Sequence, residues 1–80
     1  MATPPLSAAT QVFGERVRAR RHQLGLSQEQ LADECGLHWT FVGQVERGKR
    51  NISLHNILKL AEALKIDPGE LVRGLRAPSG

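Results

Sequence analysis

Apolar residues recur along the chain at the spacing of one helix face, and they do so in five separate segments. The strongest pattern begins after Ser53 and continues to about Lys65, with apolar side chains at positions i, i+3, i+4, i+7 and i+10. Those positions are held by Leu54, Ile57, Leu58, Ala61 and Leu64. Ser53 is suited to cap this helix. No strand is predicted, so we expect an all-α fold.

Two shorter helices joined by a tight turn are predicted between residues 27 and 48. Ser27 and Gln30 have the spacing of a capping box, which marks the start of the first helix. That helix ends at Gly36, a residue that can adopt the left-handed conformation found at many helix ends. The pattern is that of a helix-turn-helix, whose second helix can enter the major groove of DNA.

The second of these helices, from roughly His38 to Arg47, has two unlike faces. The face to be buried contains Phe41, Val42 and Val45. The opposite face combines an aromatic residue, a glycine, two short hydrogen-bonding residues and a cation, namely Trp39, Gly43, Thr40, Gln44 and Arg47. Because glycine destabilises a helix by about 0.5–1 kcal/mol relative to alanine, close approach by a partner is a plausible reason for this one.

The remaining segments predict one helix at each end of the chain. Ser7 is suited to cap a helix from about Ala8 to Leu24. Asp67 caps the last helix, which has a proline at its first position and ends near Gly74 or Arg76.

A chain of 80 residues allows one small domain. We expect residues 1–7 to be a disordered arm, 8–76 the helix-turn-helix domain and 77–80 a frayed tail. A core this small is marginally stable alone, which favours pairing with a second copy.

The net charge of +3 comes with cations concentrated in two segments, a distribution that suits a polyanion. We expect Arg16, Arg18 and Arg20 to lie on a solvated helix face. A second group follows the predicted second helix of the pair and is expected to contact DNA phosphates: Lys49, Arg50 and Asn51.

The single cysteine and the three histidines predict no metal site. Cys35 lies on the apolar side of its helix, so we expect a core residue of a protein in a reducing compartment. His22, His38 and His55 are expected to be structural or exposed, without enough ligands for a closed zinc site. No apolar run approaches membrane-spanning length and no leader is apparent, so a cytoplasmic protein without membrane contact is expected.

The chain resembles the lambda-repressor-like, Cro/CI-type (XRE) family of DNA-binding proteins over Phe13 to Leu75. The stretches that carry the resemblance are RVRARRHQLGLSQEQLA and VERGKRNISLHNILKLAEAL. The controller proteins of restriction–modification systems are similar in particular to the run GLHWTFVGQVERGKRNISLHNI. The resemblance implies a compact five-helix domain with the helix-turn-helix in helices two and three. It also implies a homodimeric transcription regulator, activator and repressor, that binds a pseudo-palindromic operator on double-stranded DNA.

By position, the resemblance assigns contact with DNA bases to Trp39, Thr40, Gly43 and Gln44. Gln44 can bond an adenine edge with both its amide atoms, worth roughly 1–3 kcal/mol of discrimination. Gln28 matches a residue that commonly bonds a phosphate, in keeping with an amide beside a helix N-terminus that favours anions. The full set of expected phosphate contacts is Ser27, Gln28, His38, Arg47, Lys49, Arg50 and Asn51.

Trp39 departs from the family pattern, because controller proteins often have an arginine there that binds guanine. Tryptophan has one donor and a broad apolar surface, so three roles stay open: contact with a thymine methyl, packing on a sugar, and packing back on the protein. Phe41 stands where relatives often have tyrosine, which removes a hydroxyl contact.

Two further sets of residues are assigned a structural role. Arg21 and Glu46 match a salt bridge between the first and third helices of phage repressors, and Glu46 falls at the edge of the buried face, where a carboxylate needs a cation. The last helix is more apolar than a single core contact requires. We therefore expect a two-fold dimer interface made by Ile52, Leu54, Leu71, Val72 and Leu75, with recognition helices about 34 Å apart.

Other classes of function have less support in the sequence. No nucleophile–base pair, glycine-rich phosphate loop or metal cluster is present, so neither enzyme activity nor a cofactor is expected. The alternative is a protein-interaction module, such as an antitoxin-type regulator that binds a partner through its last helix. No second domain is available to hold a small-molecule effector, so none is expected.

Overall fold

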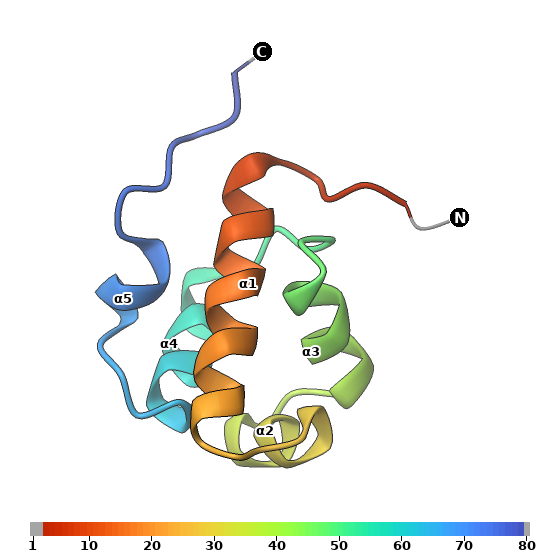
Figure 1. Ribbon diagram of the computed structural model, residues 1–80, viewed down its shortest axis with the longest axis vertical. Coiled ribbons are helices and arrows are strands. Elements are labelled where there is room, and N and C mark those ends of the chain that lie inside the picture. The colour runs from red at the N-terminus through yellow and green to blue at the C-terminus, as the bar shows by residue number, and fades with distance from the viewer. Residues whose placement is uncertain (1–2, 80) are drawn as a thin grey trace.

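The computed structural model describes residues 3–79, and in that range the chain forms five helices (Figure 1). They are α1 (Ala8–Gln23), α2 (Gln28–Cys35), α3 (Trp39–Glu46), α4 (Leu54–Ala63) and α5 (Pro68–Val72). Since no described residue belongs to a strand, the predicted all-α class is confirmed. α1 packs against α3 and α5, α2 against α3 and α4, and α4 against α5.

Side-chain caps begin four of the helices at the predicted residues. Ser7, Ser27, Ser53 and Asp67 each accept a hydrogen bond from a backbone N–H in the first turn that follows. At Ser27 the bonds are reciprocal, because Gln30 N–H donates to Ser27 Oγ (3.0 Å) and Ser27 N–H donates to Gln30 Oε1 (2.8 Å). These contacts join residues three apart in sequence, so each helix start is encoded locally.

One apolar core joins all five helices. Each helix contributes at least one side chain without solvent exposure: Val17, Leu31, Val42, Leu60 and Leu71. Cys35 is buried in the same core, as predicted, and this burial raises the pKa of its thiol. The prediction that Leu71 belongs to a dimer interface is wrong, because that side chain is already covered by its own chain.

α1 and α3 approach each other closely at Gly14. A Cβ atom on this residue would lie 2.6 Å from the carbonyl oxygen of Glu46 and would also collide with that of Val45. Real Cβ atoms do not come so near to backbone atoms, so only glycine permits this distance between the two helices. The sequence had offered no reason for a glycine inside α1.

Two arginines of α1 hold the ends of other helices, which corrects the expectation of a solvated face. Arg20 Nε donates to Leu64 O (2.9 Å) at the end of α4, and Arg16 Nη1 donates to Arg73 O (2.7 Å) just beyond α5. The last carbonyls of a helix have no partner within it, and cationic side chains are suited to them. Arg18, between the two, is exposed as predicted.

The last helix is shorter than the sequence analysis predicted. α5 ends at Val72 rather than near Gly74 or Arg76, because Arg73 leaves the helical conformation with φ −56° and ψ 129°. Among the described residues, no helix has both the length and the hydropathy needed to cross a bilayer.

The segment before α1 is attached to the body at one point. The N–H of Leu6 donates to the carbonyl oxygen of Gly48 (2.9 Å), and Thr10 Oγ1 donates to the same oxygen (2.8 Å). Leu6 therefore lies bonded beside the end of α3, whereas the sequence predicts that it belongs to a disordered arm. Residues 1, 2 and 80 of the predicted arm and tail lie outside the described part of the chain.

Candidate nucleic-acid interface

α2, the turn after it and α3 form a helix-turn-helix. Gly36 ends α2 with φ +70°, and the next residue, Leu37, donates its N–H to Ala32 O (3.0 Å). Glycine adopts this left-handed conformation without the penalty that a Cβ brings. Residues 36–38 therefore make the whole connection, and α3 begins at Trp39 with α2 packed against it.

The four predicted base-contacting residues, which we call the recognition face, are not equally accessible. Trp39 is 51% exposed, Thr40 is exposed and Gln44 is half-buried. Gly43, however, is buried: a Cβ atom built on it would lie 3.4 Å from both Gln28 Oε1 and Arg47 Nη1. In the free protein Gly43 thus lies beneath these two flexible side chains, and its contact with a base stays a prediction.

The start of α3 is capped by a histidine, His38, which the sequence does not predict. The Nδ1 atom of His38 accepts the backbone N–H of Thr40 (3.2 Å) and lies 2.7 Å from the Thr40 hydroxyl oxygen. The His38 ring also stacks on Trp39, with centroids 5.9 Å apart and planes 26° apart. The sequence leaves three roles open for Trp39, and one of them is packing back on the protein. In the structure Trp39 packs on the protein through His38, an exposed neighbour, and not on the core.

Gln44 is held by a residue from the loop that follows α3. Arg50 Nε donates to Gln44 Oε1 (2.7 Å), while the Arg50 guanidinium carbon lies 5.5 Å from the centre of the Phe41 ring. This distance is that of a cation–π contact. The phenylalanine that stands where relatives often have tyrosine therefore supports the arginine through its ring face.

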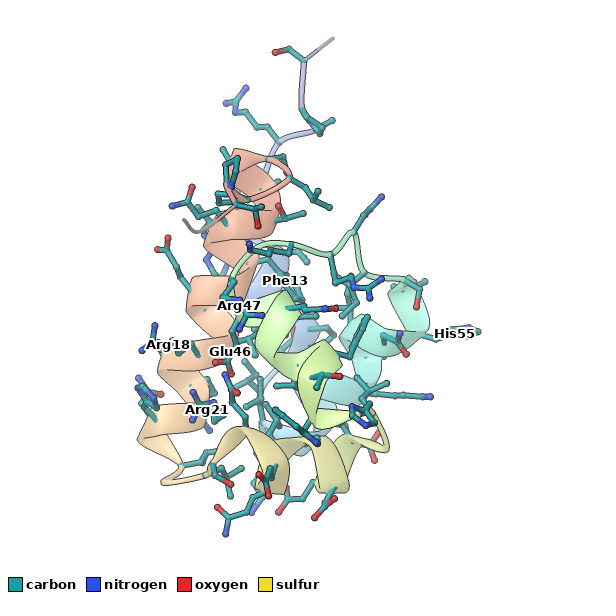
Figure 2. The ribbon with its side chains drawn as sticks, turned by 90° about the vertical axis from the view of Figure 1, so that its right-hand side faces the viewer. Phe13, Arg18, Arg21, Glu46, Arg47 and His55 are labelled. Atoms are coloured by element: carbon teal, nitrogen blue, oxygen red, sulfur yellow. The ribbon has the colours of Figure 1, made fainter. Side chains whose placement is uncertain are left out.

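A buried polar network connects α1, α2 and α3 behind the recognition face. Arg21 Nε donates to Glu46 Oε2 (2.7 Å) and Arg21 Nη2 to Glu46 Oε1 (3.0 Å), so the structure contains the ion pair expected from the resemblance. Gln28 Nε2 donates to the same Glu46 Oε1 (3.0 Å). Figure 2 shows Arg21 and Glu46 meeting between α1 and α3, whereas His55 points away from the body. Bidentate, charge-assisted bonds of this kind fix orientation as well as adding stability.

The residues expected to contact phosphates lie around the recognition face. They differ in how many hydrogen-bond donors are still free to reach a phosphate. Ser27 uses its backbone N–H within its capping box, so only its hydroxyl hydrogen is available. Gln28 has committed one amide hydrogen to Glu46 and keeps the other. Arg47, Arg50 and Asn51 are exposed and Lys49 is half-buried. The cations therefore lie at the C-terminal end of α3 and in the loop after it.

The described polar side chains form no metal-binding group and leave no buried atom unpaired. Within residues 3–79, no three histidine, cysteine or acidic side chains are grouped so as to hold a metal ion. Every buried side-chain nitrogen and oxygen in that range has a hydrogen-bond partner.

Sequence reasoning missed His38 as a cap and Arg50 as the partner of Gln44. The cap could have been predicted locally, because His38 directly precedes the first apolar position of α3. Histidine is not among the usual caps, which include serine, threonine and aspartate. The contact of Arg50 had no local signal, since it depends on how the loop after Gly48 folds back over Phe41.

Comparison with known proteins places this geometry among DNA-binding domains. Residues 17–71 match the helix-turn-helix family. The control protein C.BamHI of Bacillus amyloliquefaciens is 47% identical over 62 residues, which are 76% of this chain and 76% of that protein.

Two solved structures are similar in fold as well as in sequence. The crystal structure of the restriction–modification controller protein C.AhdI from Aeromonas hydrophila has a TM-score of 0.78 and 58% identity, covering 80% of this chain and 97% of that one. The c2 repressor of phage P22, crystallised with a synthetic operator, has a TM-score of 0.74 and 35% identity, covering 81% of this chain and 98% of that one.

Proposed function

The chain belongs to the XRE-type helix-turn-helix family of DNA-binding transcription regulators, and from this premise we propose that it is a restriction–modification controller protein. In this proposal it binds a pseudo-palindromic operator on double-stranded DNA as a homodimer, in the cytoplasm and without a small-molecule effector. The assignment to controllers follows from the similarity to C.BamHI and C.AhdI over most of the length of each protein.

The observation that carries the proposal is the contrast between the two sides of α3. On the inner side, Arg21 and Gln28 both donate to Glu46 and so fix α3 to α1 and α2. On the outer side, Trp39 and Thr40 are exposed although neither is needed for the core. A rigidly backed helix with free aromatic and polar side chains is suited to the major groove.

The charges next to α3 supply the nonspecific part of binding. In the proposed complex, Arg47, Lys49 and Arg50 lie against the phosphates that flank the groove. Each cation that neutralises a phosphate steepens the dependence of log K on log salt by roughly 0.9. These residues position the protein on the duplex, and the recognition face selects the sequence.

Exposed apolar side chains on α4 and α5 support the proposed dimer. Leu54 is 67% exposed and Leu58 42%, although both lie on a helix that contributes to the core. Val72, at 40% exposure, lines a shallow groove together with Ile52 and Leu75. Pairing of these surfaces in two copies would remove them from water, with the fully buried Leu71 taking no part.

Selection of bound sequences from a random pool of duplex oligonucleotides tests the proposal. We expect the wild-type protein to return one pseudo-palindromic sequence with half-sites about one helical turn apart. Gln44→Ala should lose its preference at one base pair in each half-site while binding to unrelated DNA stays nearly the same. Recovery of no preferred sequence at low salt would contradict the assignment, and capture of a protein partner without DNA protection would favour an antitoxin-type module.

A further inference from the structure

We propose that two hydrogen bonds in the free protein fix the polarity of the recognition face, so that Thr40 offers DNA an acceptor and Gln44 offers it donors. The inference depends on the proposed function, since it concerns how the same face selects its operator. It specifies which chemical groups the operator must present to the protein. It also identifies His38 and Arg50 as residues that position Thr40 and Gln44.

The Thr40 hydroxyl has one hydrogen, and the structure directs it to His38. The Thr40 backbone N–H points at His38 Nδ1 (3.2 Å), and because an N–H can only donate, Nδ1 must be an unprotonated acceptor. The hydroxyl oxygen, 2.7 Å from the same nitrogen, then has to donate its hydrogen there. What remains on the exposed side of the Thr40 oxygen is lone pairs, which accept.

The orientation of the Gln44 amide is set by a donor, the Arg50 side chain, rather than by an acceptor. Arginine has five N–H donors and no acceptor, so the atom that Arg50 Nε touches at 2.7 Å must be the amide oxygen. The NH2 group therefore occupies the other branch of the amide. Arg50 cannot easily move away, because its guanidinium group also lies over the Phe41 ring. Gln44 thus presents its two hydrogens from a half-buried, supported position.

An acceptor on Thr40 and donors on Gln44 each require a complementary group on a base edge in the major groove. Donors there are the exocyclic amino groups of adenine and cytosine, while acceptors are purine N7, guanine O6 and thymine O4. Thr40 and Gln44 are four residues apart, so they lie on one side of α3, one turn from each other. We infer that the operator places an amino group opposite Thr40 and an N7 or keto oxygen opposite Gln44.

The experiment begins with the operator obtained by selection and identifies the base pair that each side chain contacts. Thr40→Val removes the hydroxyl at nearly constant volume, and Gln44→Ala removes the amide. The contacted base pair is the one whose replacement weakens the wild-type protein but not the variant, as in a double-mutant cycle. Thermal melting of each variant confirms that these changes at accessible positions leave the fold intact.

Single groups are then deleted from these base pairs. Opposite Thr40, 2-aminopurine in place of adenine, or 2-pyrimidinone in place of cytosine, removes the amino group from the major groove. We expect the wild-type affinity to fall about fivefold and that of Thr40→Val to stay unchanged. Opposite Gln44, loss of the contacted acceptor should weaken the wild-type protein to a similar degree but not Gln44→Ala. A 7-deazapurine removes N7, 2-aminopurine in place of guanine removes O6, and a thymine analogue can lack O4. Loss of affinity on deleting the opposite kind of group, or no loss at either position, would overturn the inference.

The positioning residues are tested by their effect on base preference. Arg50→Lys keeps the charge but loses the planar group over Phe41, and we expect the preference at the Gln44 base pair to fall about fivefold with an unchanged salt slope. His38→Ala should reduce the amino preference opposite Thr40, whereas His38→Asn, which retains a side-chain acceptor at the cap, should preserve it. If the Arg50 and His38 variants weaken all sequences equally, these residues do not position the recognition face. Failure of the wild-type protein to bind any selected DNA would instead refute the proposed function.

Discussion

At the scale of single residues, Gly14 in α1 and Gly43 in α3 have very different surroundings. Gly14 permits α1 to lie against the backbone of α3, where even one methyl group would collide with a carbonyl oxygen. Gly43 has ordinary space around it, bounded by the flexible side chains of Gln28 and Arg47. The same substitution at the two positions should therefore have different consequences for stability.

We expect Gly14→Ala to destabilise the domain by about 3 kcal/mol, the upper part of the usual range for overpacking, because backbone atoms must move to admit the Cβ. Gly43→Ala is the matched control: it should be neutral or stabilise α3 by up to about 1 kcal/mol, through better helix propensity. Urea unfolding followed by circular dichroism measures both. Equal stability of the two variants would show that α1 and α3 can separate without penalty.

The buried pair of Arg21 and Glu46 is the second residue-scale feature with a large expected effect. Glu46→Ala leaves the guanidinium of Arg21 buried without its carboxylate, which costs about 3–5 kcal/mol. DNA affinity should fall as well, because Gln28 loses its partner. Replacing both members, Arg21→Met with Glu46→Leu, should destabilise less than the single change, since no unpaired charge remains. An unchanged melting curve for Glu46→Ala would contradict the role of the pair.

At the scale of elements, α1 organises the fold through polar contacts as well as apolar ones. Its buried side packs on α3 and α5, while Arg16 and Arg20 reach the carbonyl groups where α5 and α4 end. The bond to α4 offsets local strain, because Lys65, the second residue after the end of α4, adopts φ +57°, a conformation that glycine would take more readily.

Arg20→Met removes the bonds to Leu64 O and Lys65 O while keeping most of the side-chain volume. We expect a loss of about 1 kcal/mol in the free energy of unfolding, the usual net value of such bonds. Arg18→Met, on the exposed face of the same helix, should change stability by less than about 0.5 kcal/mol. A loss of the same size for both variants would indicate that net charge, not the helix end, is responsible.

The elements also show which features a sequence can predict. The helices and most of their caps follow from contacts between residues three or four apart, so Ser27 with Gln30 was sufficient to place the start of α2. Other features depend on residues distant in sequence. These are the burial of Gly43 and Leu71 and the hydrogen bonds that Arg16 and Arg20 donate to the ends of other helices. A helical wheel gives the side of a helix but not which neighbour covers it.

At the scale of the whole molecule, two regions of the described surface matter for the proposed function. One is the recognition face with the cations that follow it. The other, which we call the apolar patch, is the set of exposed apolar side chains on α4 and α5: Leu54, Leu58 and Val72. A protein that binds a two-fold symmetric operator needs both, because the second sets the distance between two copies of the first.

Leu54→Glu should shift the protein towards monomer, because it places a charge where the two copies are expected to meet. Leu6→Glu is the matched control, since Leu6 is similarly exposed, at 62%, but lies outside the patch. Sedimentation at tens of micromolar distinguishes the outcomes. A wild-type monomer at that concentration, or equal effects of the two changes, would exclude this patch as the dimer interface.

The hydrogen bond between Leu6 and Gly48 has a consequence for where a fluorophore or affinity tag is best attached, because it fixes the path of the amino-terminal segment. It directs residues 3–5 past the loop that carries Lys49 and Arg50, whereas the opposite terminus leaves from the side of α5 (Figure 1). A fluorophore at the amino end would therefore sense an arriving duplex, and a bulky affinity tag there would obstruct it. Surface immobilisation is better made through the carboxyl end.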